Sequence, residues 1–138
     1  MPVIKVEGKT IEISSDGESI KIVNFLSADE AREILEEDKE KLRQSRAEKF
    51  HSDVLTKIVK ALGLKMNDCK DILEDIMDVQ IKTFKDLQKV YSTGLDISLT
   101  FQLTPPRAIF SSGSEVASVP LTGGEEFFMG LRSALINK

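Results

Sequence analysis

The chain has 138 residues, of which 41% are hydrophobic and 30% charged, which predicts one soluble globular domain with its own core. Its formal net charge of −4 excludes a generally basic surface for nucleic acid or anionic lipid. The single cysteine, Cys69, excludes an intrachain disulfide, and no apolar run approaches the roughly 20 residues of a membrane helix, so we expect a reduced, cytoplasmic protein without a membrane partner.

The first 24 residues predict a three-stranded antiparallel meander. Its strands are expected at 3–7, 10–14 and 19–23, with turns at Gly8-Lys9 and Asp16-Gly17. Asp-Gly suits a tight hairpin because both central residues need positive φ. Alternation places six aliphatic side chains on one face: Ile4, Val6, Ile11, Ile13, Ile20 and Ile22. A bare three-stranded sheet is marginal, so another layer must cover this face.

Helices are expected to supply that cover. Ser27 and Glu30 form a capping box that opens a first helix. The charged segment 36–49 contains neither glycine nor proline, which favours a solvated helix over a linker. Lysines are interleaved with the carboxylates of this segment, which favours a solvated helix face over a pair for acid/base chemistry. The carboxylates are Glu36, Glu37, Asp38 and Glu40.

Two longer helices are predicted on either side of Gly63. Apolar residues recur at helical spacing from Phe50 to Leu62, and Gly63 suits the left-handed position that ends a helix. Asn67 or Asp68 caps the next helix, which is expected to run to about Tyr91. That helix is apolar on two sides, which predicts contact with two layers or with a partner subunit. The predicted oligomer interface comprises Ile76, Val79, Ile81 and Phe84.

After Gly94 the hydrophobic period changes to two, which indicates a strand over 95–103. Pro105 and Pro106 end it, because proline cannot donate to the ladder. Further strands are expected at 108–111 and 116–121, followed by a capping box at 122–125 and a final helix. The expected fold class is α+β, with an N-terminal meander, a central helical hairpin, a second small antiparallel sheet and a C-terminal helix.

One domain is expected to span residues 1–138. Residues 1–48 hold 8 basic and 12 acidic residues, whereas residues 49–138 hold 11 of each, so the acidity belongs to the meander and the first helix. The second part, 49–138, comprises the helical hairpin, the sheet and the closing helix.

Catalytic residue patterns are sparse. His51 is the only histidine and is interpreted as a surface or boundary residue, because a zinc site of ordinary ligand type would need partners that the chain lacks. The glycines in GSE, residues 113–115, and in TGGEE, residues 122–126, precede glutamates rather than a phosphate-loop lysine. The sequence therefore predicts a protein that is not an enzyme and has no catalytic residues, no metal and no cofactor.

A pattern of helix ends and glycines runs through the second part of the chain. One helix ends in Ala61-Leu62-Gly63-Leu64, the acidic Asp68 follows, and Lys89-Val90 leads through Gly94 into a strand. At the C-terminal end VPLTGGEEFFMGLRSAL places a proline-containing strand before a short helix. Over about residues 51–135 this resembles the bacterial histone-like HU/IHF family. The resemblance implies an intertwined homodimer that binds DNA through a basic β-ribbon arm with a wedging proline.

The segment that matches this arm departs from the family. Residues 102–115 contain Pro105 and Pro106 but only one basic residue, Arg107, which cannot supply the phosphate neutralisation that such binding needs. A helix–turn–helix reader is also disfavoured, because the second helix would begin with the acidic NDCKDILED, residues 67–75. The candidate nucleic-acid-binding residues are Lys82, Lys85, Lys89 and Arg107.

Three functional hypotheses follow. The first is a non-enzymatic protein-interaction or assembly module that forms a homo-oligomer, with protein as its partner. The alternative is an HU-like architectural nucleic-acid-binding protein, which the acidic charge disfavours. The third is a small ligand-binding or enzymatic domain, to which no residue set points.

Overall fold

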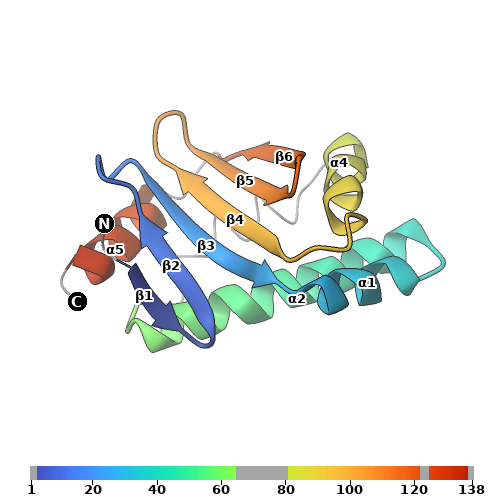
Figure 1. The fold of residues 1–138 in the computed structure, drawn as a ribbon, viewed down its shortest axis with the longest axis horizontal. Helices are drawn as coiled ribbons and strands as arrows, with labels where there is room; N and C mark the ends of the chain where they lie inside the picture. The colour runs from blue at the N-terminus through green and yellow to red at the C-terminus, as the bar shows by residue number, and fades with distance from the viewer. Residues whose placement is uncertain (1–2, 65–80, 122–124, 137–138) are drawn as a thin grey trace.

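The protein has an α+β fold in which a six-stranded antiparallel sheet is covered by helices (Figure 1). The structure is a computed structural model that describes residues 3–64, 81–121 and 125–136. The strands are β1 (Val3–Val6), β2 (Lys9–Ile13), β3 (Ser19–Leu26), β4 (Ile97–Gln102), β5 (Arg107–Ser112) and β6 (Glu115–Pro120). The described helices are α1 (Ala28–Glu36), α2 (Glu40–Ala61), α4 (Ile81–Tyr91) and α5 (Glu125–Ile136). The predicted fold class is confirmed at this level.

The two predicted sheets are one. The strands lie in chain order from β1 to β6, and the pairing of β3 with β4 joins the N-terminal meander to the later one. Ile22 lies opposite Leu99 and Ile20 opposite Phe101, so both strands present aliphatic or aromatic residues to the same face. The expected second small sheet therefore does not stand alone.

An irregularity in β3 carries that strand beyond the predicted end at Val23. The register shifts between Ile22 and Leu26, and Asn24 has a positive φ of 53°. Because of this bulge, the consecutive residues Phe25 and Leu26 are both fully buried. The strand thus reaches far enough to pair Leu26 with Ile97 of β4.

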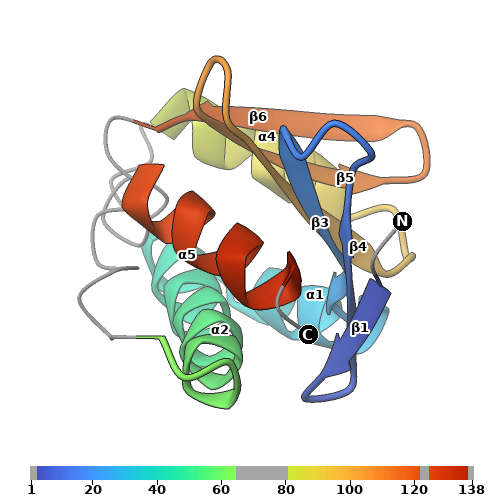
Figure 2. The same ribbon diagram turned by 90° about the vertical axis from the view of Figure 1, so that its left-hand side faces the viewer.

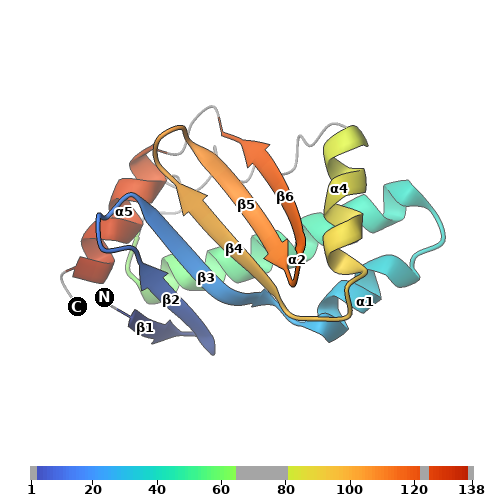
Figure 3. The same cartoon turned by 45° about the horizontal axis from the view of Figure 1, so that its top comes forward.

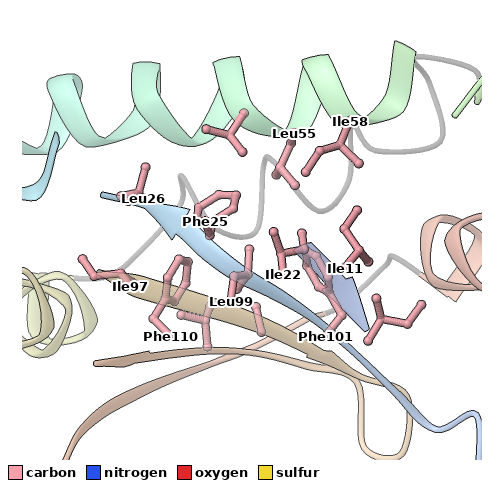
Figure 4. Close-up of a cluster of buried hydrophobic side chains, with 14 of the residues drawn as sticks. Ile11, Ile22, Phe25, Leu26, Leu55, Ile58, Ile97, Leu99, Phe101 and Phe110 are labelled. Atoms are coloured by element: carbon pink, nitrogen blue, oxygen red, sulfur yellow. The ribbon is translucent and has the colours of Figure 1, made fainter. Parts of the chain in front are cut away.

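The core lies between the sheet and α2. Buried side chains of successive strands form a row across the sheet: Ile11, Ile22, Leu99, Phe110 and Ala117. Leu55 and Ile58 of α2 point toward this row (Figure 4). Both α2 and α5 lie on the same face of the sheet (Figure 2). Residues 40–49 of the charged segment are helical and belong to α2, whereas residues 37–39 are not helical and separate α2 from α1, so the predicted helix over 36–49 is confirmed only in part.

The local backbone signals match the sequence at the helix stop but differ at both hairpin turns. Gly63 has a φ of 74°, as the predicted helix stop requires. The first hairpin turn, however, lies at Glu7-Gly8, where both residues have positive φ, and not at Gly8-Lys9. This is the pair of angles that a two-residue turn between antiparallel strands needs. At the predicted Asp16-Gly17 turn only Gly17 has a positive φ, 71°, and residues 14–18 join β2 to β3, so this connection is not the two-residue hairpin that the sequence predicts.

The capping box before α1 is confirmed. The Glu30 N–H donates to Ser27 Oγ at 3.1 Å, and the Ser27 N–H donates to Glu30 Oε1 at 3.0 Å. We expect Ser27→Ala to lower the free energy of unfolding by about 1 kcal/mol, because the helix loses an acceptor for one free N–H. Urea unfolding measures this loss. Ser15→Ala, at an exposed turn position, is the control, and an equal loss in both variants would contradict the capping role.

Candidate interaction surface

The sheet has one face that no described helix covers. Alternate residues of all six strands point to this side, which we call the open face. It comprises Val3, Lys5, Thr10, Glu12, Ser19, Lys21, Val23, Ser98, Thr100, Gln102, Arg107, Ile109, Ser111, Val116, Ser118 and Pro120. Helices α2 and α5 lie on the other face (Figure 2), whereas α4 stands beside the β6 edge (Figure 3).

Charge is unevenly distributed over the open face. The β1–β3 half carries Lys5, Glu12 and Lys21, and Glu12 lies opposite Lys21. The β4–β6 half carries a single charge, Arg107, whose Nε donates to Ser118 Oγ at 2.5 Å. Since 30% of the chain is charged, nine average positions would carry about three charges, so this area has fewer charges than the average of the chain. Depletion of charge is the compositional mark of the centre of a protein interface.

Exposed apolar side chains lie on and beside the β4–β6 half. Val116 on β6 is 58% exposed, and Ile109 on β5 is half-buried. Leu95, which is 54% exposed, approaches the β5–β6 turn so closely that a Cβ on Gly113 would lie 3.2 Å from Leu95 Cδ1. Val116 and Leu95 therefore lie near the β5–β6 turn at one end of the open face, whereas Ile109 lies nearer the middle of the β4–β6 half, opposite Thr100 and Ser118. These residues were not predicted from the sequence, although the alternate positions of β4–β6 that face this side carry only one charge, Arg107.

The two edges of the sheet differ. The β6 edge runs beside α4 and ends at Pro120, which has no N–H to donate (Figure 3). The β1 edge has no neighbouring strand among the described residues, but it is only four residues long and carries the exposed Lys5. Short strands and lysine are devices that discourage edge pairing. The open face, not an edge, is therefore the larger available surface.

His51 is buried, so its interpretation as a surface or boundary residue was wrong. It lies on the inner face of α2, is 1% exposed, and stacks on Phe110 with ring centroids 5.2 Å apart. Its Nε2 lies 3.0 Å from the Tyr91 hydroxyl, and the two groups share one hydrogen bond. Its Nδ1 has no partner among the described residues. Burial lowers the pKa of His51 to about 3 and raises that of Tyr91, so both are neutral near pH 7.

The structure does not gather the candidate nucleic-acid residues into one site. Lys85 and Lys89 are exposed on α4, and Lys89 lies 3.9 Å from Asp86. The side chain of Lys82 is outside the described set. Arg107 follows the β4–β5 turn, which lies away from α4 in both Figure 1 and Figure 3. The segment that would match a DNA-binding arm is folded into the sheet as β4 and β5, which are joined by a four-residue turn.

The predicted oligomer interface is only partly visible. Ile76 and Val79 lie outside the described residues, and so does the Ile81 side chain. Phe84 is 2% exposed and packs in the core of its own chain, which leaves almost no area for a second copy. The prediction of an interface on this helix therefore has no exposed apolar residue to support it within the described part of α4.

The remaining candidates for chemistry give no site in the described part of the chain. No group of three or more His, Cys, Asp or Glu there could hold a metal ion. Gly113 lies in the turn between two strands and precedes no helix. Glu37 accepts from Arg46 at 2.6 Å, and Glu40 accepts from Gln88 at 3.3 Å, so these carboxylates tie α2 to its neighbours.

Among the described helices, none combines the length and apolarity needed to cross a membrane.

No protein-family model, curated protein or solved structure matches the chain.

Proposed function

We propose that the protein is a non-enzymatic assembly module that self-associates through the open face of its sheet. The observation that carries this proposal is the nearly uncharged, partly aliphatic β4–β6 half of that face. Its small hydroxyl side chains, with Ile109 and Val116 among them, suit packing against another flat sheet about 10 Å away. A second copy of the chain is the partner, related by a two-fold axis so that the same surface serves both subunits.

The size of the open face fits a stable interface. Six strands spaced about 4.8 Å apart span about 29 Å, and strands that average about six residues at about 3.4 Å each span about 20 Å. The flat area approaches about 600 Å², and the relief of the side chains brings the accessible area toward the roughly 800 Å² per partner of standard interfaces. Pairing of the β4–β6 half alone would bury too little, so the charged β1–β3 half serves as the polar rim.

Substitution in the β4–β6 half of the open face tests this proposal. Sedimentation velocity of the wild type should give a dimer at micromolar concentration. Ile109→Glu places a charge in this half of the interface and should weaken dimerisation at least tenfold, because the carboxylate would be desolvated without a partner. Val116→Glu, at a position that is 58% exposed on the same face, should act in the same direction without touching the core.

Met129→Glu is the matched control. Met129 is 45% exposed on α5, on the helix-covered side of the molecule, so this change adds the same charge away from the proposed interface. The control should remain a dimer. A wild-type monomer at about 100 µM, or two open-face variants that dimerise as tightly as the control, would overturn the proposal.

A further inference from the structure

A depression lies where the β2–β3 turn meets the last turns of α5, away from the open face. Its volume is about 420 Å³, within the range of small-molecule sites. Its lining residues are Ile13, Ser14, Ser15, Asp16, Gly17, Arg132 and Ile136. The turn and α5 lie close together on the same side of the molecule in Figures 1 and 3. Two segments more than 100 residues apart in sequence therefore build this site.

Arg132 provides a cation in the depression. Its guanidinium packs over Gly17, where a Cβ would lie 3.3 Å from the Cζ, Nε and one terminal nitrogen of Arg132. Gly17 also has a φ of 71°, so the close approach and the backbone both call for glycine at this position. Within the described part of the chain, Arg132 forms no ion pair or hydrogen bond. The turn thus supports the guanidinium while leaving its donors available.

The nearby carboxylate does not neutralise Arg132. Asp16 Oδ1 accepts from the Ser14 hydroxyl at 2.6 Å and from the Glu18 N–H at 3.0 Å. These two hydrogen bonds, that of Ser14 first, lower the pKa of Asp16, and no ion pair joins it to Arg132. Asp16 is therefore committed to its own turn. Its negative charge disfavours a dianion in the depression more than a monoanion.

The walls add an apolar element. Ile136 on α5 is 58% exposed beside the cation, and Ile13 contributes from the end of β2. A guanidinium binds a carboxylate through two parallel hydrogen bonds, and exposed aliphatic carbons favour an alkyl group next to it. We propose that this depression binds a small monocarboxylate with a short aliphatic body, whose carboxylate pairs with Arg132 and whose body lies against Ile136.

Titration with hexanoate, acetate and inorganic phosphate, followed by amide NMR, tests this site. Hexanoate should shift the resonances of residues 14–17 and 132–136 and bind at least tenfold more tightly than acetate, which lacks the aliphatic body. Phosphate should bind more weakly than hexanoate. Equal binding of hexanoate and phosphate, or no shift in these residues, would overturn the proposal.

Variants separate the two parts of the site. Arg132→Gln should weaken hexanoate binding at least tenfold, whereas Arg32→Gln should leave it unchanged, because Arg32 is exposed on α1 and pairs with Asp29 at 3.0 Å. Ile136→Ser should weaken hexanoate severalfold while leaving acetate unaffected. Unchanged thermal unfolding would establish that the variants are folded, and unaltered hexanoate affinity in Arg132→Gln would refute the assignment.

Discussion

Phe110→Ala should lower the free energy of unfolding by about 3–5 kcal/mol. The Phe110 side chain is fully buried in the middle of β5, stacked on His51 at 5.2 Å and edge-on to Phe25 at 6.2 Å between ring centroids. Removing the ring leaves a cavity where three elements meet, because β3, β5 and α2 are fixed by their own hydrogen bonds and cannot collapse into it. The loss would be a large part of the roughly 5–15 kcal/mol of a typical domain.

Urea unfolding followed by circular dichroism measures the effect, with Ile109→Ala as the control. Ile109 is adjacent in sequence but belongs to the open face. For the monomeric protein its loss should be about 1 kcal/mol or less. A loss below about 1 kcal/mol for Phe110→Ala would contradict the position of this ring in the core. A concentration-dependent loss for Ile109→Ala would instead agree with burial of the open face in a dimer.

Local patterns predicted most of the secondary structure. The alternation of Ile11 and Ile13 with polar neighbours, and the capping box at Ser27 and Glu30, depend on residues close in sequence, so the chain itself carries the signal. The pairing of β3 with β4 could not be predicted in this way, because about 70 residues separate the two strands. The bulge at Asn24 was missed for a related reason, since only the neighbouring strands decide that Phe25 and Leu26 both face inward.

The candidate surfaces were less accessible to sequence reasoning. The sequence does show that the residues of β4 on the open face are uncharged; these are Ser98, Thr100 and Gln102. Knowing that no described helix covers those residues required the fold. The depression at Arg132 depends on the meeting of α5 with the β2–β3 turn, for which the sequence contains no local pattern. His51 was misinterpreted because the buried face of a helix is inferred from its most apolar residues. Phe50 is more apolar than His51, so the sequence favours Phe50 for the buried face.

Lowering the pH should destabilise the protein through His51. The pKa of His51 is depressed by burial to about 3 in the folded state, against about 6.5 in the unfolded chain. The unfolded state therefore binds one more proton between these values, and the contribution of His51 to stability, complete above pH 6.5, is lost as the pH falls toward 3. The expected slope is about 1.4 kcal/mol per pH unit, or on the order of 4–5 kcal/mol over the whole window.

His51→Gln separates this effect from the titration of the carboxylates. Glutamine does not titrate, and its amide can occupy the position of Nε2 beside the Tyr91 hydroxyl, which lies 3.0 Å away in the wild type. Between pH 7 and pH 4, urea unfolding should show the wild type losing about 3 kcal/mol more than the variant, whatever the variant's stability at pH 7. The comparison of slopes cancels the carboxylates, because both proteins carry the same set. Parallel curves would mean that His51 is protonated in the folded state, which would require water or an acceptor to reach its Nδ1.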